Sequence, residues 1–309
     1  MKGPLFYSKI LLFGEYGIIK DSKGLSIPYN FYNGALKMDG NTSDEALSSN
    51  EGLKAFVDHL RTIDGDLVSF DFDTLQDHID NGMYFDSSIP QGYGVGSSGA
   101  LVAAIYDKYA KNTITVLENL TREKLLILKN IFSEMESFFH GKSSGLDPLN
   151  SYLSLPILIN SKDNIEATGI PSQESSGLGA VFLLDSGITG ETAPMVRIFM
   201  ENMKHEGFRS MIKDQFVKHT DACVDDFLKG DIKSLFKNTK RLSKVVLNHF
   251  KPMIPKQFHE LWKKGIETNE YYLKLCGSGG GGYILGFTQD FNKAKLALAD
   301  YKLEVVYNF

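Results

Sequence analysis

The segment Pro90–Gly99 leads a glycine-rich loop directly into a helix-forming sequence, a pattern suited to binding phosphate. Glycine permits positive φ angles and close backbone approach, and the free N–H groups and dipole at a helix start attract anions. A hydroxyl group there can also ligate a magnesium ion held between nucleotide phosphates. A glycine-rich turn with a serine N-cap is the alternative. The candidate phosphate-binding residues are Gly92, Gly94, Gly96, Ser97, Ser98 and Gly99, and either of the tandem serines offers such a hydroxyl.

Two other phosphate-binding motifs compete for this part of the chain. Gly94–Gly99 satisfies G-x-G-x-x-G, and Glu118 follows at nearly the distance of a ribose-binding acid, so an NAD(P)-dependent oxidoreductase is the alternative function. Against it, Pro90–Tyr93 separates the preceding strand from the first required glycine. Gly141–Ser143 resembles the end of a P-loop, but Glu136 stands where that motif requires its first glycine.

Two acidic residues could take part in the same chemistry. A helix is predicted from Thr121, its N-cap, to Phe139, and Glu136 lies about 40° from Phe132, at the edge of the apolar stripe, at 100° per residue. A carboxylate facing the core needs a cation, a metal or hydrogen-bond donors, unless it reaches water at the boundary. Asp147 follows eleven residues later and precedes Pro148, which predicts an extended, rigid presentation suited to a general base, although Asp-Pro also marks plain turns.

Two further segments carry candidate residues near the beginning and end of the chain. The predicted strand Lys9–Phe13 turns at Gly14 into Glu15 and Tyr16. A lysine beside an aspartate would hold the aspartate as an anion and lower the pKa of a nearby hydroxyl group, although a solvated strand lysine is the alternative for Lys9.

Four consecutive glycines, Gly279–Gly282, interrupt two strand-like runs. A hairpin needs only two such residues, so the tract indicates close backbone approach. We interpret it as a second phosphate-facing or substrate-gating loop, with Gly279 and Gly280 as substrate-binding candidates.

The surrounding elements predict an α+β protein of two domains. A helix is predicted to begin at Ser98 and to run through Tyr109, and polar, glycine- and proline-containing loops between 161 and 177 place a boundary near 174, giving domains 1–174 and 175–309. Strands bracket several helical patterns in the second half. The other predicted strands are Gly17–Ile19, Val68–Phe72, Met83–Phe85, Ala180–Leu184, Leu273–Leu275 and Tyr283–Phe287.

Composition narrows the function classes. Among 309 residues, 33 Lys and Arg oppose 38 Asp and Glu, and the net charge of −5 disfavours general binding to nucleic acid or anionic membranes. Cys223 and Cys276 are too few for a disulfide framework or a zinc site. No apolar run suffices for a signal peptide or a membrane span. We therefore expect a cytoplasmic protein that binds a small molecule, not nucleic acid or a membrane; a homodimer is an open alternative to a monomer.

Three separated blocks of the chain resemble the motifs of the GHMP small-molecule kinases. Lys9–Tyr16 resembles the first motif, K followed by three hydrophobic residues and x-G-E-H; Pro90–Ala100 resembles P-x-x-x-G-L-G-S-S-A; and Lys274–Tyr283 resembles K-L-T-G-A-G-G-G-G-C. Glu136–Asp147 is similar to E-x-x-x-H-G-x-P-S-G-x-D of the mevalonate kinase branch, with the same eleven-residue separation of the acids. The blocks occur in the family's order over most of the chain.

The resemblance implies a fold and a set of roles. The implied fold is an N-terminal domain like ribosomal S5 domain 2 and a ferredoxin-like C-terminal domain, with the active site in the cleft between. Ser98 and Glu136 would hold Mg²⁺ with the ATP phosphates, Asp147 would be the catalytic base or charge-positioning acid, and Lys9 would lie by the substrate hydroxyl. Glu15 and Tyr16 would line the substrate side.

The departures from the family motifs bear on the substrate. Tyr16 stands where mevalonate kinases usually have His and is reminiscent of phosphomevalonate kinases, whereas the unbroken Gly279–Gly282 run favours mevalonate. Ser143 replaces the usual Pro and Gly99 the usual Ala, changes expected to affect loop rigidity more than chemistry. The expected activity is Mg²⁺- and ATP-dependent phosphorylation of the primary hydroxyl of mevalonate. Phosphomevalonate kinase, another GHMP kinase and a catalytically idle nucleotide-binding homologue are the alternatives within the family.

Overall fold

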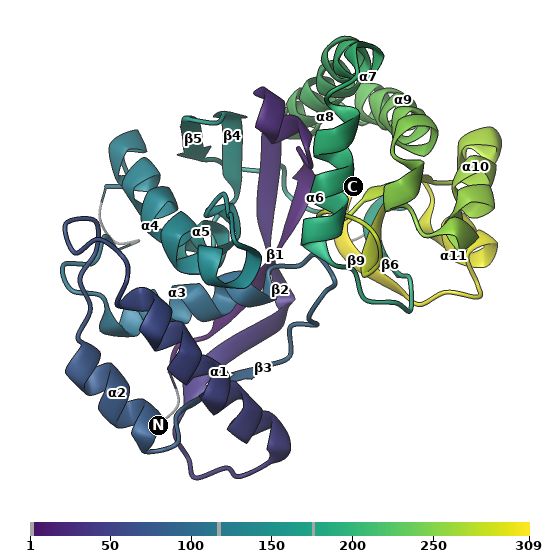
Figure 1. The fold of residues 1–309 in the computed structure, drawn as a ribbon. Coiled ribbons are helices and arrows are strands. Elements are labelled where there is room, and N and C mark those ends of the chain that lie inside the picture. The colour runs from purple at the N-terminus through teal and green to yellow at the C-terminus, as the bar shows by residue number, and fades with distance from the viewer. Residues whose placement is uncertain (1–2, 116–118, 175–176) are drawn as a thin grey trace. The chain divides into compact units, whose positions relative to one another are not determined.

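The computed structural model describes residues 3–115, 119–174 and 177–309, and in it the chain divides into two compact units (Figure 1). Unit 1 contains the chain up to Lys9, together with Ile27–Pro90 and Gly96–Leu155. Unit 2 contains Ile10–Ser26, Gln91–Val95 and Pro156–Phe309. Both units are discontinuous in sequence; the domain boundary near 174 and the cleft between domains stay predictions.

The first part of the chain combines long helices with three strands, and strands β1 and β2 contribute residues to both units. Strand β3 pairs antiparallel with β2, with Gly34 opposite Ser87. The segment before the phosphate loop is therefore not the start of a parallel βαβ unit, which argues against the dinucleotide-binding alternative. The elements are β1 (Phe6–Phe13), β2 (Gly24–Lys37), α1 (Asp44–Leu60), α2 (Phe72–Asp80), β3 (Tyr84–Ser87), α3 (Ser97–Tyr109), α4 (Arg122–His140) and α5 (Leu146–Leu153).

Helix α4 follows the sequence prediction closely. The Thr121 side chain accepts a hydrogen bond from the backbone N–H of Lys124, as an N-cap residue does. The apolar stripe is buried from Leu125 to Met135, and Glu136 is buried with it, whereas Phe139 at the end of the stripe is exposed. Because the stripe packs inward, the helix itself carries this carboxylate into the interior of unit 1.

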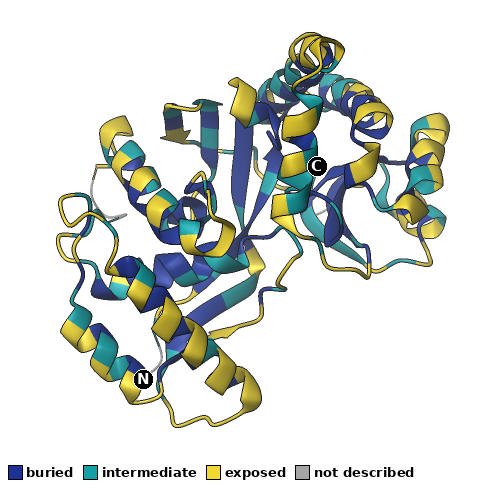
Figure 2. Cartoon of the chain, in the orientation of Figure 1, coloured by how far each residue is buried: buried dark blue, intermediate teal, exposed yellow. Residues whose placement is uncertain are grey.

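The later elements of unit 2 form an antiparallel sheet of four strands in the order β7-β8-β6-β9, with α9 and α10 packed on β7. Strands β7 and β8 are buried along their whole length. Figure 2 shows that exposed residues lie mainly on the helices and loops. The order of a strand, helices, two strands, a helix and a strand follows the predicted ferredoxin-like pattern. These elements are β6 (Ala180–Asp185), α6 (Thr192–Asn202), α7 (Glu206–Met211), a π-helix (Ile212–Val217), α8 (Lys218–Lys229), α9 (Ile232–His249), α10 (His259–Thr268), β7 (Tyr272–Leu275), β8 (Tyr283–Thr288), α11 (Phe291–Ala297) and β9 (Leu303–Asn308).

Unit 2 also contains strands β4 (Ile157–Ser161) and β5 (Asn164–Ala167), which pair antiparallel. Gly24–Ser26 of β2 pairs with β4. The short 3₁₀ helices are Gly17–Lys20, Lys251–Met253 and Lys256–Phe258. Together, these elements confirm the mixed α+β prediction.

Two predicted strands are wrong. Gly17–Ile19 lies in a 3₁₀ helix, because Tyr16 adopts a left-handed φ of 59° and turns the chain. Val68–Phe72 forms only an isolated bridge through Phe70, and Phe72 begins helix α2 because the Asp71 side chain caps that helix at Thr74. Apolar runs of this length occur both in strands and in helices. At Phe72 the Asp71 cap determines that the run begins a helix.

Candidate active site

Lys9 and Asp147 form an ion pair in unit 1. Lys9 projects from β1 and is 3% exposed, and its Nζ lies 2.8 Å from Oδ1 of Asp147. The Asp147 side chain is 38% exposed, so it faces solvent while one of its oxygens is held. The predicted juxtaposition of these residues is therefore present.

The conformation of Asp147 corrects the sequence prediction. It is not extended but lies in the first turn of α5, after Gly145, which has a φ of 71°. Pro148 does not prevent this, because a proline is tolerated in the first turn of a helix. Asp147 is therefore presented by a helix start.

Glu136 is a buried carboxylate held by two hydroxyl groups. It is 3% exposed; Ser98 Oγ donates to its Oε1 at 2.9 Å, and Ser143 Oγ donates to its Oε2. Burial, and then the negative charge of Asp147, raise the pKa of Glu136 to about 7, although both hydroxyl groups and Lys9 act in the opposite direction. A bound cation would favour the ionised form.

Two glycines of the phosphate loop allow this cluster to assemble. A Cβ on Gly96, whose φ is 82°, would lie 3.1 Å from Cγ of Lys9. A Cβ on Gly99 would lie 2.8 Å from the backbone carbon of Asp147 and the same distance from the Pro148 nitrogen. Gly99 in place of the usual alanine is thus a packing requirement of this chain as well as a matter of loop rigidity.

Two residues that the sequence did not point to as site residues also contact this cluster. His140, the last residue of α4, places Nε2 3.2 Å from Ser98 Oγ. Ser143 contacts Glu136 directly, although it was expected to affect loop rigidity more than chemistry. The signal for both was their position in the block that includes Glu136 and Asp147.

The donor set of this cluster suits magnesium. Ser98 and Glu136 offer oxygen atoms, the ligands that Mg²⁺ prefers, and the buried carboxylate gains a counter-ion when a cation binds. Within 3–115, 119–174 and 177–309, no group of three or more His, Cys, Asp and Glu side chains could hold a metal ion. Mg²⁺ here would therefore depend on water and phosphate oxygens for its remaining ligands, as it commonly does with nucleotides.

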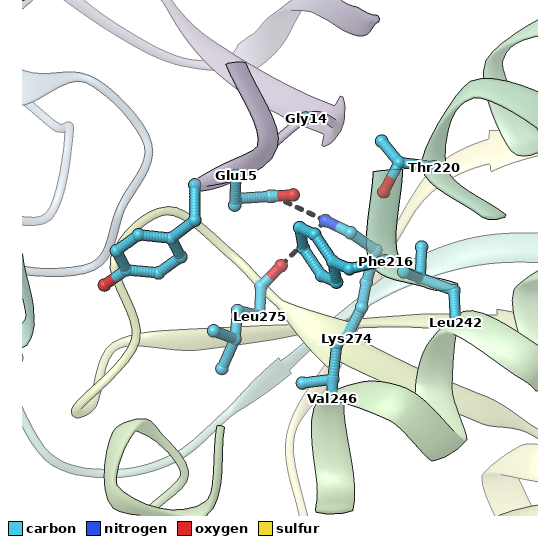
Figure 3. Close-up of a pocket in the computed structure, with 9 residues that line it drawn as sticks. Gly14, Glu15, Phe216, Thr220, Leu242, Val246, Lys274 and Leu275 are labelled. Atoms are coloured by element: carbon cyan, nitrogen blue, oxygen red, sulfur yellow. Dashed lines mark hydrogen bonds and ion pairs between the residues drawn. The ribbon is translucent and has the colours of Figure 1, made fainter. Parts of the chain in front are cut away.

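The second group of predicted residues lies in unit 2. Glu15 and Lys274 form a buried ion pair of 2.5 Å, in which the side chains are 6% and 4% exposed. Lys274 Nζ also donates to the Leu275 carbonyl at 2.8 Å. Figure 3 shows the Glu15 carboxylate pointing to Lys274 beside Phe216 and Thr220. A small cavity of about 10 Å³ lies among these side chains, which is of the order needed for one water molecule.

Tyr16 lies beside this pair and fixes the glycine segment. Its hydroxyl donates to the Ser278 carbonyl at 2.6 Å, and its ring stacks on Phe199 at a centroid distance of 4.7 Å. Burial raises the pKa of Tyr16, so the phenol stays protonated and remains a donor. The substrate-facing roles predicted for Glu15 and Tyr16 stay predictions.

The glycine tract approaches protein backbone closely. A Cβ on Gly282 would lie 2.5 Å from Cα of Tyr93, and one on Gly279 would lie 2.6 Å from the Met253 carbonyl oxygen. Gly280 N–H donates to that same carbonyl at 2.7 Å. The sequence predicted that the tract closely approaches another group, and part of this approach is to neighbouring protein backbone.

Two glycines of the phosphate loop also lie against other backbone of unit 2. A Cβ on Gly94 would lie 2.4 Å from the Cys276 carbonyl oxygen, and Gly92 accepts a hydrogen bond from Gly190 N–H at 2.9 Å. The ligand-binding roles of Gly92, Gly94, Gly279 and Gly280 stay predictions.

Glu118, the ribose-binding acid of the oxidoreductase alternative, lies outside the described residues. Within the part of the chain that the structure describes, no helix has the length and apolar character needed to cross a membrane.

Residues 64–154 match the family model described as GHMP kinases N terminal domain. L. major mevalonate kinase in complex with R-mevalonate shares the fold with a TM-score of 0.60 at 18% identity, covering 97% of this chain and 90% of that chain. The Methanococcus jannaschii mevalonate kinase shares the fold with a TM-score of 0.60 at 17% identity, covering 99% of this chain and 98% of that chain. The Streptococcus pneumoniae phosphomevalonate kinase in complex with phosphomevalonate and AMPPNP gives 0.62 at 13% identity, covering 99% of both chains. No curated protein sequence matches the chain.

These comparisons confirm the predicted resemblance to the GHMP kinases. The segment that matches the family model contains Ser98, Glu136 and Asp147. At these identities the solved structures show the fold that the chain shares with them.

Proposed function

Taking the chain as a member of the GHMP kinases, we propose that it transfers a phosphoryl group from ATP to the primary hydroxyl of mevalonate. The observation that carries the proposal is the cluster in unit 1. It combines the Lys9–Asp147 ion pair with a buried carboxylate and a hydroxyl group at the start of α3.

The start of α3 supplies the phosphate-binding groups. The first N–H groups of a helix have no partner within the helix, and those of Ser97, Ser98 and Gly99 occupy these positions. Together with the positive end of the helix dipole they favour the phosphate groups of ATP. The glycines that precede them let the loop backbone reach these groups.

Ser98 and Glu136 would hold Mg²⁺ beside those phosphate groups. When bound, the ion would neutralise phosphate charge that builds up during transfer. The protein contributes the carboxylate and the hydroxyl group that bind the ion, and burial keeps water from competing at Glu136.

Asp147 would receive the proton of the acceptor hydroxyl on its carboxylate. The Lys9 ammonium holds one oxygen of this side chain and so fixes the orientation of the carboxylate. Lys9 also adds positive charge near the reacting oxygens. Phosphoryl transfer depends largely on positioning and charge neutralisation, which this pair supplies without forming a covalent intermediate.

Mevalonate is proposed as the acceptor on sequence grounds. The block from Glu136 to Asp147 and the unbroken Gly279–Gly282 tract both resemble the mevalonate kinase motifs. The second candidate is a phosphomevalonate kinase, which Tyr16 favours, and a solved structure of that activity has a comparable TM-score of 0.62.

The test is an ADP-release assay with Mg²⁺ and ATP across mevalonate, phosphomevalonate, homoserine and galactose. We expect release with mevalonate far above the rate without an acceptor. Release with phosphomevalonate alone would select the second candidate. ATP binding without release on any of the four would support the idle homologue and refute both candidates.

A further inference from the structure

The Glu136 carboxylate is held on both oxygens by hydroxyl groups from different elements. Ser98, at the start of α3, donates to Oε1, and Ser143, in the loop between α4 and α5, donates to Oε2. A carboxylate with only one such donor could rotate about its terminal torsion, which has a broad energy minimum. The second donor therefore restricts the plane of the group.

The Ser143 side chain is itself held in one orientation. Its Oγ accepts a hydrogen bond from Gly145 N–H at 3.0 Å, so its single hydrogen is free to point at Glu136. Its carbonyl accepts from Ser133 Oγ at 2.6 Å, which ties the loop back to α4. Hydrogen bonds to its hydroxyl oxygen and to its carbonyl oxygen thus hold Ser143 in place before any ligand binds.

We propose that Ser143 is a positioning residue that orients Glu136 to hold the magnesium ion of the MgATP complex. The inference rests on the proposed function, because it concerns the metal ligand assigned there. A proline stands at this position in the motif that the chain resembles, and proline has no hydroxyl to donate. The serine is therefore a feature of this chain, and its effect reaches the metal through Glu136.

The effect is expected on metal binding. Loss of a group that orients a metal ligand typically weakens metal affinity by about 10- to 100-fold. We expect Ser143→Val to raise the Mn²⁺ concentration for half-saturation, in the presence of a non-hydrolysable ATP analogue, by about tenfold. Threonine has nearly the same shape as valine but retains the hydroxyl group. The Mn²⁺ concentration for half-saturation of Ser143→Thr should therefore stay within about threefold of the wild-type value.

The experiment measures Mn²⁺ binding by electron paramagnetic resonance, without acceptor substrate, for the wild type and the Val and Thr variants. Ser144→Ala is the matched control, because Ser144 is the exposed neighbour in the same loop. Thermal unfolding without metal is measured in parallel, and a Val variant as stable as the Thr variant excludes a general folding defect.

Steady-state kinetics should show a change in the Mg²⁺ requirement of the Val variant but little change in its turnover rate. The Val variant should need about tenfold more Mg²⁺ for half-maximal rate and should regain a rate within about twofold of wild type at saturating Mg²⁺. Equal Mn²⁺ affinity for the Val and Thr variants would overturn the role of Ser143, as would a lower rate at every Mg²⁺ concentration with unchanged half-saturation.

The two proposals fail in different ways. If the wild type binds Mn²⁺ with the analogue but phosphorylates no acceptor, the proposed function fails, and the Val and Thr comparison still decides the role of Ser143. If the wild type binds neither the metal nor the analogue, both proposals are refuted.

Discussion

Replacing Glu136 by Gln should stabilise the protein above neutral pH while removing its proposed activity. Glutamine has nearly the same shape as the protonated carboxyl and, like it, offers both an oxygen acceptor and a donor, but it cannot ionise. Burial raises the pKa of Glu136 from 4.5 to about 7, so the folded state favours the protonated form. The ionised carboxylate therefore destabilises the folded protein when no cation is bound.

The magnitude follows from the difference between the two pKa values. Each pH unit between them corresponds to about 1.4 kcal/mol, so a rise from 4.5 to about 7 gives a total of about 3 kcal/mol. Below pH 4.5 the side chain is protonated in both states, and the contribution of the raised pKa to stability is fully present. As the pH rises towards 7, the unfolded chain releases its proton first, and this stability is lost.

The assay is urea unfolding at pH 5 and at pH 8.5 without Mg²⁺ or nucleotide. The free energy of unfolding of Glu136→Gln should exceed that of the wild type by an amount that grows by about 2 to 3 kcal/mol between these pH values. Glu134→Gln is the control, because Glu134 is exposed on the same helix. The difference in free energy of unfolding between this variant and the wild type should be the same at both pH values. A Glu136→Gln difference that stays flat or shrinks as pH rises would refute the reasoning.

Three other substitutions test separate parts of the molecule. Asp147→Asn should lower kcat by about 10²- to 10⁴-fold with little change in ATP affinity, measured by ADP release and nucleotide titration; near-normal turnover would contradict its role as the base. Gly99→Ala should destabilise the fold by about 1 to 3 kcal/mol, because its Cβ would meet backbone at 2.8 Å, whereas Gly52→Ala, in an open position on α1, should stabilise it by about 0.5 to 1 kcal/mol in the same unfolding assay. Tyr16→Phe should cost about 0.5 to 1.5 kcal/mol by removing the hydrogen bond to the Ser278 carbonyl, and a variant as stable as the wild type would show that this bond contributes nothing.

The sequence predicted those features that depend on neighbouring residues. Glycines followed by serines gave the start of α3, and Thr121 gave the start of α4. The helical period placed Glu136 on the buried side. These are properties of one turn or one face, so no knowledge of distant chain segments is needed to infer them.

Only the tertiary structure decided what the buried polar groups contact. Glu15 pairs with Lys274, 259 positions away, and the conformation of Asp147 depends on helix α5, which begins at Leu146 and packs on α3. The glycine tract predicted that its backbone lies close to another group. Its sequence did not indicate whether that group is a ligand or the protein backbone at Met253. A hydrogen bond or ion pair between distant residues exists only once the backbone has folded, so the residue types suggested the chemistry of this site and the packing fixed its geometry.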